Sequence, residues 1–128
     1  MCYDVKVGAK SYCNTICGGS IYDKDTIITS AQCCEIIDDE KDYKIVAGEL
    51  DTYSESGLEQ IIEINQYNHI IHPEYNSITL ENDVCKLMLN TSLNITNNQV
   101  ETIQLSTEDP KVGSQCIVSG WGAVLVRI

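Results

Sequence analysis

Short runs of β-branched and other apolar residues recur along the chain, and polar clusters typical of turns separate them. No long stretch shows the 3.6-residue periodicity of an amphipathic helix. The predicted strands cover Tyr3 to Val7, Ile16 to Tyr22, Thr26 to Ala31, Tyr43 to Glu49, Gln60 to Ile71, Val84 to Leu89 and Ser114 to Ser119. Such regular short strands are typical of an all-β sandwich or barrel.

The segments between these runs are mostly predicted to be surface loops. Glu35 to Asp42 and Ser54 to Gly57 are rich in acidic or small residues, and only Ala31 to Ile37 favours a short helical turn. No internal repeat, low-complexity tract or Pro/Gly-rich linker divides the chain.

Length and charge narrow the class of protein. With 128 residues and 14.2 kDa, the chain has room for one domain. Its 19 acidic and 8 basic residues give a formal net charge of −11. This balance excludes nucleic acid as an expected partner, because phosphates need a basic patch. It also disfavours anionic membrane surfaces, and every apolar run is far too short to span a bilayer.

The cysteines indicate an oxidising compartment. The chain has seven, at positions 2, 13, 17, 33, 34, 85 and 116, and none of them forms the C-x-x-C spacing of zinc or redox motifs. Asn90 and Asn94 begin two N-glycosylation sequons, which agree with a secreted, disulfide-bearing protein. The sequence shows no signal peptide at Met1, and an odd cysteine count leaves one thiol without a partner. We therefore expect the chain to be incomplete.

Five short motifs follow one another in a defined order. They are Cys17-Gly18-Gly19-Ser20, Thr29-Ser30-Ala31-Gln32-Cys33, His72-Pro73-Glu74-Tyr75-Asn76, Asn82-Asp83-Val84 and Ser119-Gly120-Trp121-Gly122. In this order and spacing they resemble the first half of a chymotrypsin-like, trypsin-family serine protease. The stretch Ile45 to Asp51 is most similar to digestive trypsins of arthropods, especially crustaceans. The resemblance extends from about Tyr3 to Gly122.

The resemblance implies two Greek-key β-barrels with a catalytic cleft between them. In the family the first barrel supplies the histidine and aspartate, and the second supplies the serine, the oxyanion hole and the specificity pocket. This chain would contain the first barrel, at about residues 3–105, and the start of the second, at about 112–128. It lacks the Gly-Asp-Ser-Gly-Gly motif and the N-terminal Ile-Val-Gly-Gly segment of the family.

One residue departs from the family at a decisive position. Where the family has Ala-His-Cys, this chain has Ala31-Gln32-Cys33. The histidine accepts the serine proton and returns it to the leaving amine near neutral pH, which an amide cannot do. In a protease of this mechanism, loss of the histidine costs roughly six orders of magnitude in turnover. This departure from the family therefore predicts that the chain has no protease activity.

Asp83 falls on the catalytic aspartate position of the family. Without a histidine to orient, we expect it to be a largely buried structural carboxylate that accepts hydrogen bonds from backbone amides near Ala31 and Gln32. We also predict that the side-chain NH₂ of Gln32 donates to Asp83 in place of the imidazole N–H.

The resemblance also implies a disulfide between Cys17 and Cys33, stabilising the fold by roughly 3 kcal/mol. It places the partner of Cys116 in the absent half. The pairing of Cys2, Cys13, Cys34 and Cys85 stays open. A vicinal bridge between Cys33 and Cys34 would be strained, so Cys34 is expected to pair elsewhere, with Cys13 as one choice.

The acidic loop that follows Ile45 to Gly48 resembles the calcium loop of many trypsins. Glu49, Asp51 and Glu59 would fall on the ligand positions, and such hard oxygen donors suit Ca²⁺. The alternative is a solvated acidic hairpin tip. No other cofactor is indicated. The two histidines, His69 and His72, are expected to serve surface or packing roles.

Two interpretations of function follow. The first is a secreted, catalytically inactive trypsin homologue, represented here by its N-terminal part. The alternative is a free-standing secreted binding module, with or without calcium, that acts as an inhibitor decoy or a protease cofactor. The expected partners are the missing C-terminal barrel or another protein, such as a protease inhibitor or an active protease.

Overall fold

The computed structural model describes residues 1–7, 10–38, 41–52, 56–95 and 98–122. Their elements are β1 (Cys2–Val7), β2 (Lys10–Thr15), β3 (Ser20–Asp23), β4 (Thr26–Thr29), α1 (Ala31–Glu35), β5 (Tyr43–Ala47), β6 (Gln60–Ile64), the 3₁₀ helix η1 (Gln66–Asn68), β7 (His69–Ile71) and β8 (Cys85–Met88). The all-β prediction is confirmed, and the predicted helical turn is α1. Among the described residues, no helix is long and apolar enough to cross a membrane.

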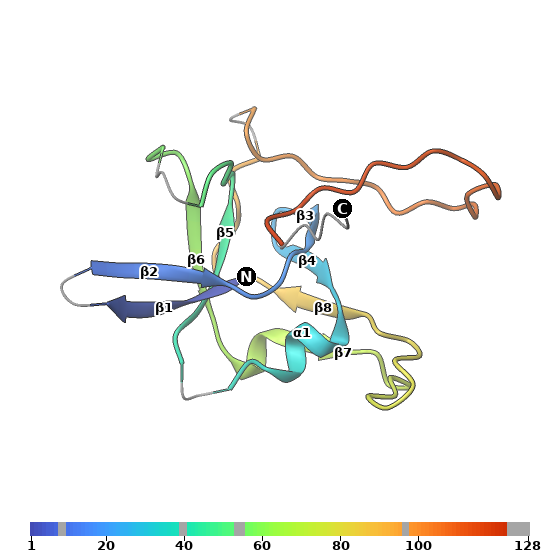
Figure 1. Ribbon diagram of the computed structural model, residues 1–128, viewed down its shortest axis with the longest axis horizontal. Helices are drawn as coiled ribbons and strands as arrows, with labels where there is room; N and C mark the ends of the chain where they lie inside the picture. The colour runs from blue at the N-terminus through green and yellow to red at the C-terminus, as the bar shows by residue number, and fades with distance from the viewer. Residues whose placement is uncertain (8–9, 39–40, 53–55, 96–97, 123–128) are drawn as a thin grey trace, which may run out of the picture.

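The strands form two four-stranded sheets, in which every paired strand is antiparallel. One sheet has the order β2-β1-β5-β6 and the other β3-β4-β8-β7. Figure 1 shows the β1–β2 hairpin extending to one side, with α1 beside β7 and β8. Antiparallel pairing is the arrangement that a regular series of short strands predicts, although β4 and β8 pair across a long stretch of chain.

Alternating side chains from both sheets build the core. Tyr43, Ile45 and Ala47 are buried along β5, and their neighbours are partly exposed. The same alternation buries Cys85 and Leu87 on β8. Side chains that point to one face of a pleated strand recur at every second residue, so each sheet presents an apolar face to the other.

Three predicted strands differ from the observed ones. The run Ile16 to Tyr22 begins pairing only at Ser20. The run Gln60 to Ile71 divides into β6 and β7, because Asn65 and Asn68 form a capping box that starts η1 between them. Ser114 to Ser119 is not a strand. In the described part of the chain, no strand pairs with it.

Residues 98–122 run as an extended segment across the end of the sheets and out to one side (Figure 1). Val100 at its start is buried in the core, but Val112, Ile117 and Val118 are between 95% and 107% exposed. The predicted second-barrel region, about 112–128, therefore has no core of its own within its described part, and residues 123–128 lie outside the described residues.

Candidate functional site

The short helix α1 determines where Gln32 lies. Ser30 caps the helix, because its Oγ accepts a hydrogen bond from the backbone N–H of Cys33 at 3.2 Å. Ala31 and Cys34 lie on the side of the helix that faces the core and are fully buried, whereas Gln32 is exposed. The sequence thus anchors two helix residues in the core and leaves the Gln32 side chain on the surface.

Two hydrogen bonds join Gln32 to Asp83. The backbone N–H of Gln32 donates to Asp83 Oδ1 at 2.9 Å, and its Nε2 donates to Asp83 Oδ2 at 2.8 Å. The structure therefore brings together the two residues that the sequence singled out, with the side-chain amide as donor. Asp83 is only partly buried, so the expectation of a largely buried carboxylate is wrong. It lies before β8, between exposed Asn82 and Val84.

These donors favour the ionised form of Asp83. The backbone N–H of Gln32 lowers the pKa of Asp83 most, and the Gln32 side chain and the Ala31 backbone lower it further, against desolvation, which raises it. The pKa therefore lies below its ordinary value of 3.8. Its contribution to stability is present above pH 3.8 and is lost as the pH falls through the lowered pKa.

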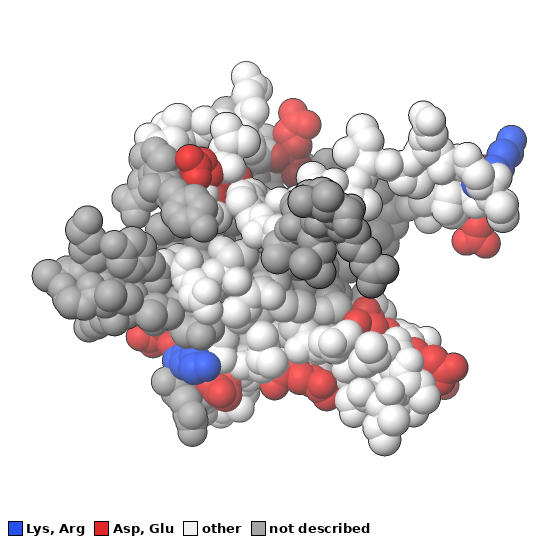
Figure 2. Space-filling model, viewed as in Figure 1, with Lys and Arg blue, Asp and Glu red and all other residues white. Residues whose placement is uncertain are grey.

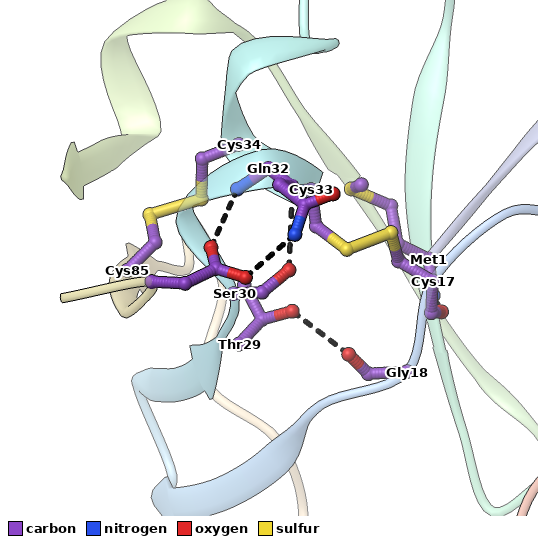
Figure 3. Close-up of a disulfide and its surroundings, with 10 residues drawn as sticks. Met1, Cys17, Gly18, Thr29, Ser30, Gln32, Cys33, Cys34 and Cys85 are labelled. Atoms are coloured by element: carbon purple, nitrogen blue, oxygen red, sulfur yellow. Dashed lines mark hydrogen bonds between the residues drawn. A yellow bond between two sulfur atoms is a disulfide. The ribbon is translucent and has the colours of Figure 1, made fainter. Parts of the chain in front are cut away.

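Disulfides flank Gln32 on both sides (Figure 3). Cys17 pairs with Cys33, the pair that the resemblance implies, and Cys34 pairs with Cys85. Cys34 therefore pairs elsewhere than with its neighbour Cys33, as expected, but its partner is not Cys13, the choice named from the sequence. Cys34 instead points from α1 into the core towards Cys85 at the start of β8, and their Cα atoms are 6.5 Å apart.

Cys13 pairs with Cys2 across the β1–β2 hairpin. The hairpin register puts Thr15 opposite Cys2, so Cys13 is its diagonal neighbour, with 5.5 Å between Cα atoms. Cys116 is exposed and free. The four cysteines whose pairing the sequence left open thus form two disulfides, Cys2–Cys13 and Cys34–Cys85.

Truncating Gln32 should weaken this site. In Gln32→Ala the backbone donor to Asp83 remains but the side-chain donor is lost, so we expect the midpoint of urea unfolding to fall with no change in its slope. Gln104→Ala, which truncates an exposed glutamine outside any element, serves as the control. A Gln32→Ala variant with full stability would refute a stabilising role for the side-chain hydrogen bond.

Tyr75 and Glu35 add to the polar surface around Asp83, and sequence reasoning did not find this pair. Tyr75 Oη donates to Glu35 Oε2 at 3.3 Å. Desolvation raises the pKa of Tyr75 most, and the charges of Glu35 and Asp83 raise it further. His72 takes part in a turn, because its Nδ1 accepts from the Glu74 backbone N–H at 3.1 Å.

The three predicted calcium ligands do not form a cluster. Glu49 accepts a hydrogen bond from the Asp51 backbone at 3.1 Å, whereas Glu59 bonds Ser56. Within the described ranges, which omit residues 53–55 of this loop, no three His, Cys, Asp or Glu side chains are grouped to hold a metal ion. Glu49 and Glu59 accept local hydrogen bonds, and calcium binding by this loop stays a prediction.

Hydrogen bonds from Ser56 perturb the titration of the Glu59 carboxyl. Its Oε1 accepts from Ser56 Oγ at 2.6 Å and from the Ser56 backbone at 2.7 Å. These two bonds, the side-chain one first, are the main causes that lower the pKa of Glu59 to about 2, and the backbone N–H groups of Glu59 and Gly57 lower it further against desolvation. Because folding favours the carboxylate, its contribution to stability is present above pH 4.5 and is lost as the pH falls towards 2.

Removing the hydroxyl should restore an ordinary titration. We expect Ser56→Ala to move the pKa of Glu59 from about 2 back towards 4.5, since the larger of the two perturbing hydrogen bonds is lost. A carboxyl-detected NMR titration measures this shift, and Ser119→Ala, at an exposed serine far along the chain, is the matched control. A wild-type Glu59 that titrates near 4.5 would contradict the assignment.

The two sequon asparagines are both exposed. Asn90 Oδ1 accepts from Asn68 Nδ2 at 2.8 Å, and the Asn94 backbone N–H donates to Gln60 Oε1 at 2.6 Å. Residue 96, which completes the second sequon, lies outside the described residues. Glycosylation at both positions stays a prediction.

The site is therefore a solvent-accessible amide–carboxylate pair on an antiparallel all-β domain, and disulfides hold the helix that carries Gln32 in place. Comparison with known proteins identifies its class. The family model described as Trypsin matches residues 3–125, so this chain belongs to the trypsin family. Its two sheets are those of the first β-barrel of the trypsin-like fold.

Curated relatives agree with this assignment. The chain is 32% identical to Trypsin V-A of Rattus norvegicus over 122 residues, which cover 95% of this chain and 45% of the relative. It is 32% identical to Trypsin-3 of Homo sapiens over 96% of this chain and 37% of that protein, and 31% identical to Trypsin epsilon of Drosophila erecta over 91% and 43%. The chain thus spans less than half the length of these relatives.

Proposed function

We propose that this chain is the N-terminal barrel of a secreted trypsin homologue that does not hydrolyse peptide bonds, because Gln32 occupies the position of the catalytic histidine. The observation that carries the proposal is the hydrogen bond from Gln32 Nε2 to Asp83 Oδ2 at 2.8 Å. An amide donor takes the place at which a trypsin needs an imidazole N–H facing the aspartate.

The chemistry of the amide supports this proposal. A general base must accept a proton near neutral pH, and the glutamine side chain has no nitrogen lone pair for this purpose. Its nitrogen is a donor and its oxygen is a weakly basic acceptor. Asp83 is held as a carboxylate by its donors and has no histidine to orient. The pair can therefore stabilise the fold without taking part in proton transfer.

The secreted location is supported by three disulfides among the described cysteines and by the membership of the trypsin family. The particular likeness to crustacean digestive trypsins stays a prediction, as does calcium binding by Glu49, Asp51 and Glu59. The remaining activity would be binding, either of protease inhibitors as a decoy or of an active protease as its cofactor.

We propose that another folded domain or protein packs against the segment around Cys116. Val112, Ile117 and Val118 are almost fully exposed in this segment, and apolar surface of this kind favours association. The occupant would be a C-terminal barrel of the same protein or another protein. The few basic side chains visible in Figure 2 and the net charge of −11 give no basis for a nucleic-acid partner.

Peptide hydrolysis by the whole protein tests the proposed function. We expect the purified protein to show no cleavage of peptide substrates above the buffer rate, because it has no base to activate a serine. Repeated purification on columns of different chemistry removes contaminating proteases, and no irreversible inhibitor is added, because it would also block a reactive serine of the protein itself. Hydrolysis that persists through this treatment and copurifies with the protein would overturn the proposal.

A further inference from the structure

The Cys34–Cys85 disulfide repeats the spacing of the Gln32–Asp83 contact. Cys34 lies two residues after Gln32, and Cys85 lies two residues after Asp83, so both links join segments separated by 51 residues. Cys34 is fully buried and Cys85 is 1% exposed, whereas Gln32 is exposed and Asp83 partly so. A buried covalent link thus lies directly beneath a surface hydrogen-bonded pair.

The surface pair needs such support for a physical reason. Water competes with hydrogen bonds between accessible side chains, and ordering two side chains costs rotamer entropy. Bringing together segments that are 51 residues apart also costs loop-closure entropy. A disulfide between the same segments removes most of this cost from the surface contact, because it raises the effective concentration of donor and acceptor.

The other disulfides do not join these two segments. Cys17–Cys33 ties α1 to the chain before β3, and Cys2–Cys13 lies within the β1–β2 hairpin of the other sheet. Figure 3 shows Gln32 on α1 between the Cys34–Cys85 and Cys17–Cys33 bridges. Among the disulfides of the described residues, Cys34–Cys85 alone links the helix that carries Gln32 to the strand that follows Asp83.

We propose that the Cys34–Cys85 disulfide is the positioning element of the site, which holds Gln32 against Asp83 and maintains the amide–carboxylate pair on the exposed surface. This inference rests on the proposed role of that pair in place of a histidine–aspartate dyad. Cys34 and Cys85 are positioning residues, because neither contacts a substrate and both act through the backbone of the pair.

The first test compares two disulfide deletions in the whole protein. Cys34→Ala/Cys85→Ala removes the proposed positioning link, and Cys2→Ala/Cys13→Ala removes a disulfide in the other sheet. We expect the first variant to raise the pKa of Asp83 towards 3.8 and to shift the NMR signals of the Gln32 side-chain NH₂. The second variant should leave both unchanged. An Asp83 titration that is the same in both folded variants would overturn the proposal.

A second test needs no cysteine substitution, so it decides the matter even where the first variant fails to fold. Coupling between two links is reciprocal: if the disulfide favours the Gln32–Asp83 contact, the contact favours the disulfide equally. We expect Gln32→Ala to make Cys34–Cys85 reducible at about fivefold lower dithiothreitol, the lower end of typical couplings. Cys2–Cys13 should be reduced as in the wild type. An unchanged reduction midpoint for Cys34–Cys85 would overturn the proposal.

These outcomes are independent of proteolysis. The positioning role fails if Asp83 and the Cys34–Cys85 reduction midpoint do not respond, even in a protein without any hydrolytic activity. The proposed function fails if the protein cleaves peptides, even where both responses are observed. The two failures are therefore distinguishable.

Discussion

Replacing Gln32 with histidine is expected to raise the rate of peptide hydrolysis by the whole protein by up to about 10⁶-fold. The imidazole would lie where Gln32 Nε2 now meets Asp83 Oδ2 at 2.8 Å, with one ring N–H donating to the carboxylate. Its other nitrogen would be free to accept the proton of a serine and to return it to the leaving amine. In the trypsin family that serine comes from the second barrel, so the whole protein is the sample.

The measurement is kcat/KM for peptide substrates, compared between wild type, Gln32→His and Gln32→Asn. The asparagine variant keeps an amide at position 32 and should remain inactive. If Gln32→His stays inactive in a protein whose second barrel carries the family serine, position 32 is not the only reason for the loss of activity. A wild type as active as the histidine variant would contradict the assignment of Gln32.

Leu87→Ala should cost about 2–5 kcal/mol of unfolding free energy, the largest loss expected from a single side chain. Leu87 is 1% exposed on β8, where its register neighbours are Ile27 on β4 and His69 on β7. Truncation removes buried apolar surface and leaves a cavity in the centre of a sheet, which close-packed neighbours fill only in part.

Urea unfolding of Leu87→Ala measures this loss, and Ile78→Ala is the matched control. Ile78 is 91% exposed, so its truncation should change the free energy by no more than about 0.5 kcal/mol. Equal effects of the two variants would show that β8 does not pass through the core as described. If only Ile78→Ala lowered the free energy of unfolding, the loop that carries Ile78 would be covered by another part of the protein.

The strands that the sequence predicted well are those with one buried face. Tyr43–Ala47 alternates buried and partly buried residues along its whole length, and its run of aromatic, aliphatic and β-branched residues already favours a strand in the sequence. The strand Lys10–Thr15 is not predicted from the sequence, because its mostly polar residues show no strand pattern. It is a strand because the chain turns back and pairs it with Cys2–Val7 along six register positions. Pairing, rather than local preference, decided its conformation.

The converse error occurred at Ser114 to Ser119. Its β-branched residues favour a strand, but a strand also needs a neighbour to satisfy its backbone hydrogen bonds. Ile117 and Val118 are more than 90% exposed, and the described chain offers them no neighbouring strand. Local preference alone could not reveal this, because partners are set by the rest of the fold.

The candidate site could be predicted from the resemblance but not from residue spacing. Gln32 and Asp83 are far apart in sequence, and no periodicity links them. The partial exposure of Asp83 could not be foreseen, because exposure depends on which elements pack around the loop before β8. The Cys34–Cys85 bridge was likewise hidden, since the cysteine count restricts pairings without choosing among them. Only the packing of α1 beside β8 selects it.

The most direct test of the central claim is a titration of the site between pH 5 and pH 9. The claim is that the side chain hydrogen-bonded to Asp83 takes up no proton near neutral pH, because it is the Gln32 amide. NMR signals of the Asp83 carboxyl and the Gln32 side-chain NH₂ in the whole protein should stay constant over this range. A titration of the Asp83 carboxyl signal with a midpoint near neutrality would reveal a base beside the carboxylate, and the account of an inactive site would be wrong.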